Sequence, residues 1–133
     1  MIILIEALLL WKLIDIFISL IAPYFIPYLG FFSYGKDMLQ YGMPDFIRAL
    51  SNFDGIFYTR IALLGYSQTE QAYFPVYPLL IRYVNYIFHN PITSGVLISH
   101  TAFVIGFVIF NKYLRLIKEQ RRLWVLLFLI AYP

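Results

Sequence analysis

The chain has 133 residues, of which 62% are hydrophobic, 20% aromatic and only 13% charged. An average soluble domain is about 45–50% apolar and about 25% charged, so this composition excludes an ordinary soluble domain and predicts an all-α, multi-pass transmembrane fold. The net charge is +3, but the basic residues form no stripe interleaved with aromatic residues, so nucleic acid is not an expected partner, and the absence of cysteine excludes a disulfide framework.

The first predicted element is an apolar helix from Ile2 to about Pro23. At about 1.5 Å per residue it is long enough to cross a hydrocarbon core of about 30 Å, and it lacks the cleavage site of a secretory signal. Lys12, Asp15 and Ser19 lie at i, i+3 and i+7, on one stripe of this helix. Either Lys12 and Asp15 neutralise each other where the helix docks on other helices, or they line a path for lipid phosphate.

Residues 24–91 form a long, largely apolar loop that we expect to lie on the membrane surface. Its first predicted helix covers residues 54–64 and presents Phe57, Ile61 and Leu64 on one face. An acid at the start of this helix and Gly65 as its stop are typical helix boundaries.

A second helix of the loop is predicted from Pro78 to His89, because proline is favoured at the first helical position. It is too short to span a bilayer, so we expect an amphipathic helix at the membrane interface. Residues 66–77 between the two helices are predicted to be irregular.

The second predicted membrane span covers about residues 92–110, which carry no formal charge, and a third begins at Leu123. The segment between them, about residues 111–122, holds half of the Lys and Arg residues of the chain. The positive-inside rule therefore places this segment in the cytoplasm and the loop of residues 24–91 on the opposite, extracytoplasmic face.

Asp54 is the most informative polar residue, because it begins a helix on the extracytoplasmic side. One interpretation is a helix N-cap, where the carboxylate accepts a backbone N–H. The compatible alternative is a general base, which needs a carboxylate fixed on a rigid element. The lone residues His89 and His100 are interpreted as structural, and the motifs of soluble enzymes are absent.

Two sequence blocks of the loop, SNFDGIFYTRIALLGY and AYFPVYPLLIR, resemble the first lumenal loop of the PIG-V family of GPI mannosyltransferases. These enzymes belong to the GT-C class of membrane glycosyltransferases, and the clear match runs from Asn52 to about Ser99. Phe53 and Tyr73 depart from the pattern, which has Trp and Phe there. The matching residues are Asp54, Gly55, Tyr58, Ile61, Ala62, Gly65, Tyr66, Ala72, Phe74, Pro75, Tyr77, Pro78 and Arg82.

The resemblance implies transfer of mannose from a polyprenyl- or dolichyl-phosphate donor to an acceptor hydroxyl, with inversion and with Asp54 as the general base. It implies that Arg60 and Arg82 hold the donor phosphate, since guanidinium groups match phosphate oxygens, although Arg60 could equally contact lipid headgroups. The aromatic residues of the loop would contact the sugar or the lipid chain of the donor. The alternative is that they only pack at the membrane interface. The expected substrate-binding residues are Tyr58, Arg60, Tyr66, Glu70, Phe74, Tyr77 and Arg82.

Family members continue for several hundred residues, so we expect residues 1–133 to be the N-terminal part of one GT-C-like transmembrane domain, inactive alone. The expected partners are a lipid-linked sugar, membrane lipids and a glycan or glycolipid acceptor. No resident cofactor is predicted, and a divalent metal is left open. The prokaryotic cell membrane is the expected location, with the endoplasmic reticulum membrane as the alternative. The competing functions are a non-catalytic membrane scaffold or assembly protein and, third, a transporter fragment.

Overall fold

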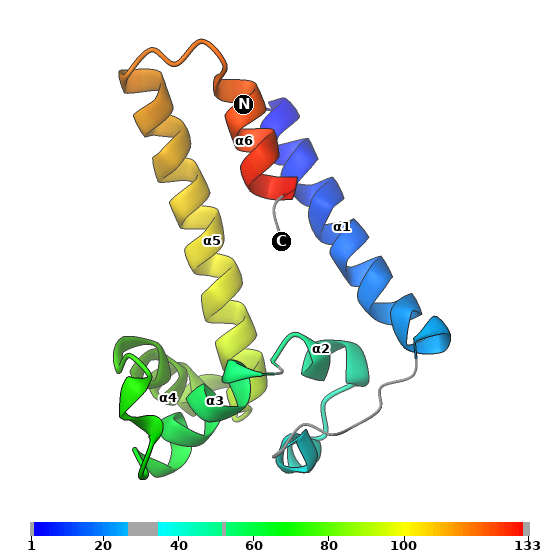
Figure 1. Ribbon diagram of the computed structural model, residues 1–133, viewed down its shortest axis with the longest axis vertical. Coiled ribbons are helices and arrows are strands. Elements are labelled where there is room, and N and C mark those ends of the chain that lie inside the picture. The colour runs from blue at the N-terminus through cyan, green and yellow to red at the C-terminus, as the bar shows by residue number, and fades with distance from the viewer. Residues whose placement is uncertain (1, 27–34, 52, 132–133) are drawn as a thin grey trace. The chain divides into compact units, whose positions relative to one another are not determined.

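The computed structural model describes residues 2–26, 35–51 and 53–131. All regular elements of these residues are helices, as Figure 1 shows, which agrees with the predicted all-α class. Asn52, where the resemblance begins, and residues 132–133, at the end of the third predicted span, lie outside the described residues.

The chain divides into two compact units. We call Met1–Pro27 together with Ala102–Pro133 the apolar unit, and Tyr28–Thr101 the loop unit. Helix α5 (Pro91–Leu116) contributes residues to both.

In the apolar unit, helix α1 (Ile2–Phe25) packs beside helix α6 (Arg122–Ala131), as Figure 1 shows. The buried core of this unit comes from α5 and α6 and is covered by side chains of α1. It consists of Phe107, Leu114, Leu126 and Ile130, packed against Ala7, Leu8, Trp11, Phe110 and Val125.

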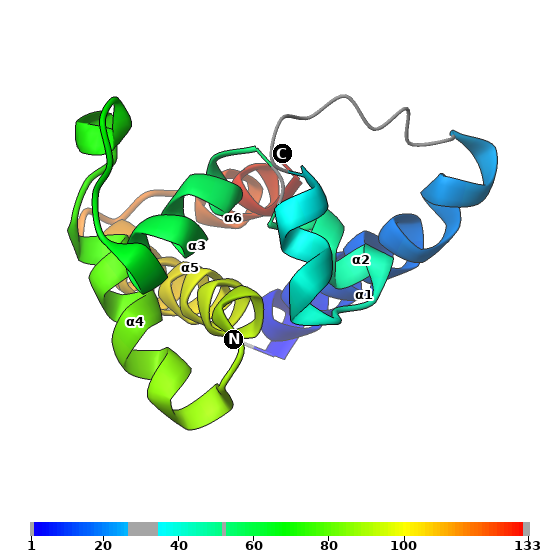
Figure 2. The ribbon, with the colours of Figure 1, turned by 90° about the horizontal axis from the view of Figure 1, so that it is seen from below.

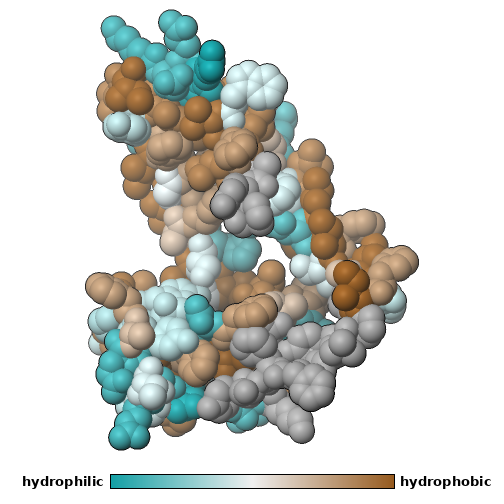
Figure 3. All heavy atoms as spheres, in the orientation of Figure 1, coloured by the Kyte–Doolittle hydropathy of each residue, from teal (hydrophilic) through white to brown (hydrophobic). Residues whose placement is uncertain are grey.

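Much of the remaining surface of the apolar unit is hydrophobic. Leu10, Leu13 and Phe17 of α1 are each about 60% exposed, and Figure 3 shows hydrophobic atoms along the helices. Among the described residues, α5 is the helix that is long and apolar enough to cross a membrane by its length and composition. The other two predicted spans form helices α1 and α6, and their crossing of a membrane stays a prediction.

Helix α5 is longer than the predicted span of residues 92–110 because its last turns use good helix formers of the predicted cytoplasmic segment. That segment is correspondingly short, and Lys118 adopts a φ of 54° within it. At the other end, Asn90 caps the helix, since its Oδ1 accepts the N–H groups of Ile92 and Thr93 at 3.1 Å each. Pro91 occupies the first helical position, where its missing N–H has no consequence.

The loop unit has Met38, Ile56 and Ile92 at its core. Figure 2 shows its helices α3 and α4, which pack against each other through many contacts. Its elements are η1 (Gly35–Tyr41), α2 (Asp45–Ala49), α3 (Asp54–Leu64), η2 (Glu70–Ala72) and α4 (Val76–Phe88).

The predicted bounds of α3 are confirmed, and Gly65 ends the helix with a φ of 86°, a conformation that favours glycine. Of the residues predicted to share one face of this helix, Ile61 is buried, whereas Leu64 is 80% exposed. Ile56 and Ala62 are buried as well. The helix packs on one side against α4 and on another against the core of the unit. Its buried surface is therefore wider than the single face of Phe57, Ile61 and Leu64 and does not coincide with it.

Helix α4 begins at Val76 rather than at Pro78, so the predicted start is wrong by two residues. Pro78 is the third helical residue, and it fits there because the N–H groups of the first turn have no partner within a helix. Ile81 is buried, whereas Tyr83 and Tyr86 are exposed, as an amphipathic helix requires. The location of α4 at a membrane interface remains a prediction.

Candidate functional site

Asp54 is the first residue of α3, and its side chain is exposed. The expectation that it caps the helix is wrong, because Phe53 is the N-cap residue and no side-chain hydrogen bond caps α3. The physical reason is the backbone: Phe53 has a φ of 59° and turns the chain, so Asp54 already has helical geometry. The carboxylate still lies at the positive end of the helix dipole.

The Asp54 carboxylate has a partner from another part of the loop. The phenol of Tyr73 donates a hydrogen bond to Asp54 Oδ1 over 3.2 Å, between residues that are 19 apart in the sequence. Desolvation, and after it this hydrogen bond and the nearby Asp54 charge, raises the pKa of Tyr73 above its ordinary value. A tyrosine phenol is already protonated at neutral pH, so Tyr73 is a donor there, and the raised pKa extends this state to higher pH.

Tyr73 belongs to a row of rings that we call the aromatic cluster, formed by Phe57, Tyr58, Tyr73 and Tyr77. Phe57 stacks on Tyr73 with ring centroids 5.1 Å apart. Tyr58 meets Tyr73 edge-on at 5.1 Å and Tyr77 edge-on at 4.9 Å. Such edge-to-face and offset pairs are favourable beyond their buried area, so the rings hold one another in place.

Tyr77 anchors the aromatic cluster to α5. Its hydroxyl lies 2.9 Å from the carbonyl oxygen of Gly95, to which it donates, and 2.7 Å from the hydroxyl of Ser99. A Cβ atom on Gly95 would lie only 3.2 Å from the Tyr77 hydroxyl and 3.3 Å from Ile81. A glycine at this position therefore permits the close approach of α4 to α5 within the loop unit.

Arg60 and Glu70 form an ion pair of 3.2 Å between Nε and Oε1, in which the Glu70 side chain is almost completely buried. The second carboxylate oxygen of Glu70 accepts the backbone N–H of Ser67 at 2.8 Å. Arg60 also donates from Nη2 to the Ser67 hydroxyl at 2.7 Å. These contacts fold the segment after α3 back onto the helix, so both predicted substrate-binding residues take part in holding the loop.

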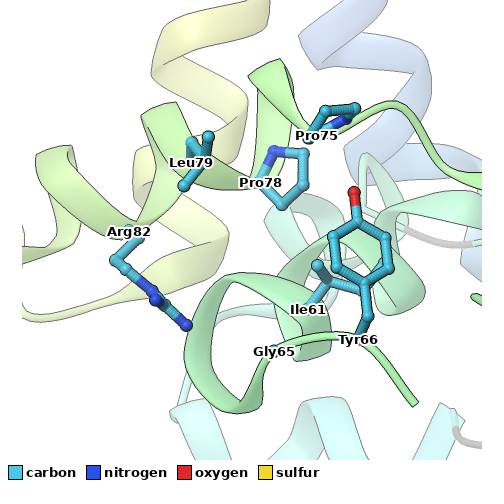
Figure 4. A pocket seen from close by; sticks show the side chains of 7 residues that line it. All are labelled: Ile61, Gly65, Tyr66, Pro75, Pro78, Leu79 and Arg82. Carbon is cyan, nitrogen blue, oxygen red and sulfur yellow. The ribbon is translucent and has the colours of Figure 1, made fainter. Parts of the chain in front are cut away.

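Arg82 lies beside a cavity of about 120 Å³ between the end of α3 and the start of α4, shown in Figure 4. Its Nε donates to the carbonyl oxygen of Ala62 at 2.6 Å, in the last turn of α3. Tyr66 lines the opposite side, and its hydroxyl donates to the Tyr73 carbonyl at 2.7 Å. The cavity is lined by Ile61, Gly65, Tyr66, Pro75, Pro78, Leu79 and Arg82.

All but one of the predicted site residues fall into three groups. Asp54, Tyr58 and Tyr77 lie at or beside the aromatic cluster, while Tyr66 and Arg82 line the cavity of Figure 4. Arg60 and Glu70 form the ion pair that holds the loop. Phe74 stands apart, with 74% of its surface exposed.

Sequence reasoning missed Tyr73 as a site residue. The available signal was its departure from the resembled pattern, which has Phe at this position, so that the only added group is a hydroxyl. A hydroxyl added beside a row of aromatic residues points to a specific hydrogen bond, but the sequence alone does not identify the acceptor.

The two histidines lie outside this arrangement. A ring nitrogen of His100 is 2.8 Å from the carbonyl oxygen of Val96 within α5, and His89 follows α4 with a φ of 50°. Among the described residues, no three His, Asp or Glu side chains gather closely enough to hold a metal ion.

No family model, curated protein or solved structure matches the chain. The resemblance to the PIG-V family therefore rests on the motif residues themselves, and the activity that it implies is a proposal.

Proposed function

We propose that the chain is part of a multi-pass membrane mannosyltransferase of the GT-C class that uses a polyprenyl- or dolichyl-phosphate donor. The observation that carries the proposal is the exposed Asp54 carboxylate at the start of α3, hydrogen-bonded through one oxygen by Tyr73 and flanked by the aromatic cluster. A carboxylate fixed by a helix and by a second side chain meets the geometric requirement for a general base. The two linked sequence blocks around Asp54 support the same function.

In this reaction Asp54 takes the proton of the acceptor hydroxyl as its oxygen bonds to the anomeric carbon of mannose. The bond between that carbon and the phosphate oxygen breaks on the opposite side, and its electron pair leaves with the lipid phosphate. The anomeric carbon is inverted, and the proton remains on Asp54 until solvent removes it. A positioned general base contributes about 10²–10⁴-fold to such a rate.

Substrate groups are assigned by the chemistry of the neighbouring side chains. Tyr58 and Tyr77 contact the sugar, because flat aromatic rings pack against its C–H faces. Arg82 holds the donor phosphate with its terminal guanidinium nitrogens, since its contact with the α3 carbonyl uses Nε. Pro78 and Leu79 of the same cavity present an apolar surface to the lipid chain.

The exposed hydrophobic surface of the apolar unit supports a membrane location for the proposed enzyme. α5 spans the bilayer, and α1 and α6 are further spans of the same domain, which is inserted in a prokaryotic cell membrane or, alternatively, in the endoplasmic reticulum. The basic residues in the last turns of α5, in the turn after it and at the start of α6 face the cytoplasm, and Figure 3 shows hydrophilic atoms at this end of the apolar unit. They are Lys112, Arg115, Lys118, Arg121 and Arg122, against the single acid Glu119.

The decisive variant is Asp54→Asn in the intact protein, assayed for transfer of labelled mannose from polyprenyl-phosphate mannose to a glycolipid acceptor. We expect turnover to fall about 10²–10⁴-fold at equal protein level, because an amide has no basic site at neutral pH. Asp45→Asn is the matched control, since Asp45 is an exposed acid on α2 that pairs with its helix neighbour Arg48, at 2.7 Å. Turnover of Asp54→Asn within about threefold of wild type would exclude Asp54 as the base.

A non-catalytic scaffold is the second candidate, and one observation favours it. Both Arg60 and Arg82 make contacts within the loop unit, as in a surface built for packing rather than for phosphate binding. For a scaffold we expect Asp54→Asn to leave every cellular phenotype unchanged, while substitutions of exposed rings such as Phe74 disrupt an assembly. Comparing the two variants in cells that lack the native protein separates the candidates.

A further inference from the structure

The Tyr73 phenol is held in place by contacts from several directions. Phe57 stacks on its ring, Tyr58 meets the ring edge-on, and the Tyr66 hydroxyl binds the Tyr73 carbonyl at 2.7 Å. The segment that carries Tyr73 is further tied to α3 by the ion pair of Arg60 with Glu70. A phenol fixed in this way can determine the orientation of the group that it binds.

The group that it binds is one oxygen of the Asp54 carboxylate. Tyr73 donates to Oδ1 at 3.2 Å, and within the described part of the chain no other hydrogen bond reaches the Asp54 carboxylate. A carboxylate accepts through both oxygens, so Oδ2 remains available to a hydroxyl from solution. Without the phenol, Asp54 is an exposed side chain at a helix end, free to change rotamer.

We propose that Tyr73 is a positioning residue of this site, which holds Asp54 through Oδ1 so that Oδ2 faces the acceptor hydroxyl. The assignment rests on the proposed function, in which Asp54 is the base, and adds a residue that the resembled family pattern does not contain. Tyr73 exchanges no proton with substrate. Its effect is to keep the base in one orientation, which lowers the barrier of the chemical step without changing substrate affinity.

The first test is a double-mutant cycle in the intact protein with Tyr73→Phe, Asp54→Asn and both together. Tyr73→Phe keeps the ring and its stacking and removes only the hydroxyl, so we expect a fall in kcat of about tenfold, as for one hydrogen bond to a charged group. KM for donor and acceptor should stay within about twofold of wild type. In the Asp54→Asn background the same substitution should change kcat by less than about twofold, because the base that it positions is gone.

Tyr86→Phe is the matched control, since Tyr86 is 70% exposed on α4 and lies outside the aromatic cluster. We expect wild-type kcat for this variant. Two outcomes would overturn the positioning role and leave the proposed function standing. In the first, Tyr73→Phe lowers kcat by the same factor in the wild-type and the Asp54→Asn backgrounds. In the second, Tyr73→Phe leaves kcat unchanged while Asp54→Asn is inactive. Wild-type turnover of Asp54→Asn would overturn both.

The second test needs no activity and uses the intact protein in detergent micelles, with ¹³C at the tyrosine Cζ atoms. The resonance lost in Tyr73→Phe reports on Tyr73, whose titratable neighbours are Asp54, Tyr58 and Glu70. We expect the raised pKa of this phenol to fall in Asp54→Asn, because a negative acceptor has been removed, and to stay unchanged in Asp45→Asn. An unchanged pKa in Asp54→Asn would show that the two groups are not in contact and would overturn the proposal.

Discussion

The apolar unit and the loop unit differ in the range of their polar contacts. In the described part of the apolar unit, side-chain hydrogen bonds join near neighbours: Lys12 binds Asp15 at 3.2 Å, and the Ser19 hydroxyl binds the Asp15 carbonyl at 2.8 Å. The more distant contact of Lys12 is with the face of the Phe103 ring, 5.3 Å from its centroid. These polar side chains thus contact groups of their own helix and one aromatic ring.

In the loop unit, by contrast, several side-chain hydrogen bonds connect distant parts of the chain. Arg82 reaches a carbonyl of α3 20 residues earlier, and Asn90 donates to the Tyr41 carbonyl at 3.0 Å, 49 residues earlier. Directional bonds between distant residues specify one path of the chain, whereas apolar packing accepts many side chains of suitable volume. Single polar residues should therefore determine the structure of the loop unit, and net apolarity that of the apolar unit.

The largest expected effect is a difference in labelling between the loop of residues 24–91 and the basic segment of residues 111–122. The two segments are predicted to lie on opposite sides of the membrane. Cysteines introduced by Gln68→Cys and Gln120→Cys are tested with a thiol reagent that cannot cross membranes, since the native chain has no cysteine. We expect labelling at position 68 but not at position 120 in intact cells, because the basic segment near Gln120 is predicted to be cytoplasmic. The reverse pattern would contradict the topology, and labelling of both after membrane disruption is the control.

The second effect concerns the charge balance of α1. Asp15→Leu removes the partner of Lys12, so in a lipid environment we expect a loss of about 2.5–3.5 kcal/mol in the free energy of membrane insertion or unfolding. The double variant Lys12→Leu/Asp15→Leu should return to within about 1 kcal/mol of wild type, since no unpaired charge remains. Denaturation by SDS in bicelles measures both variants. A double variant as unstable as the single one would show that the apolar unit depends on this specific pair.

The third effect concerns the buried acid of the loop unit. Glu70→Gln keeps an acceptor for the Ser67 N–H but removes the charge opposite Arg60, so we expect the unit to lose about 2 kcal/mol of stability. Hydrogen exchange of the amides after α3 measures this loss. Glu119→Gln is the control, because that acid accepts one exposed N–H from Arg121, and its loss should cost below about 0.5 kcal/mol. Equal exchange in both variants would contradict the role of Glu70.

The smallest effect separates two roles of Arg82. Arg82→Lys keeps the charge but loses the fixed Nε contact with the Ala62 carbonyl, for which we expect about 1 kcal/mol less stability of the loop unit. If the guanidinium also holds the donor phosphate, KM for the donor rises as well, since lysine cannot form the same bidentate contact. Unchanged hydrogen exchange in α3 would refute the structural role, and an unchanged KM would refute the binding role.

The sequence by itself determined the features that depend on near neighbours. The helical class, the bounds of α3 and the pairing of Lys12 with Asp15 follow from periodicity, stop signals and a spacing of three residues, which a helix converts directly into proximity. Gly65 ends α3 as predicted because its positive φ is a property of that residue. Helix starts were less certain, as α4 shows, since prolines at 75 and 78 both fit a first turn.

Only the tertiary structure decided which distant groups meet. Residues 19 apart, such as Asp54 and Tyr73, come together because the segment after α3 folds back, and that path depends on the buried ion pair of Arg60 with Glu70. No local rule selects Tyr73 over the neighbouring aromatic residues or assigns a backbone carbonyl to Arg82. Long-range partners are set by the summed packing of the whole unit, whereas sequence patterns record only what lies within a few turns of one helix.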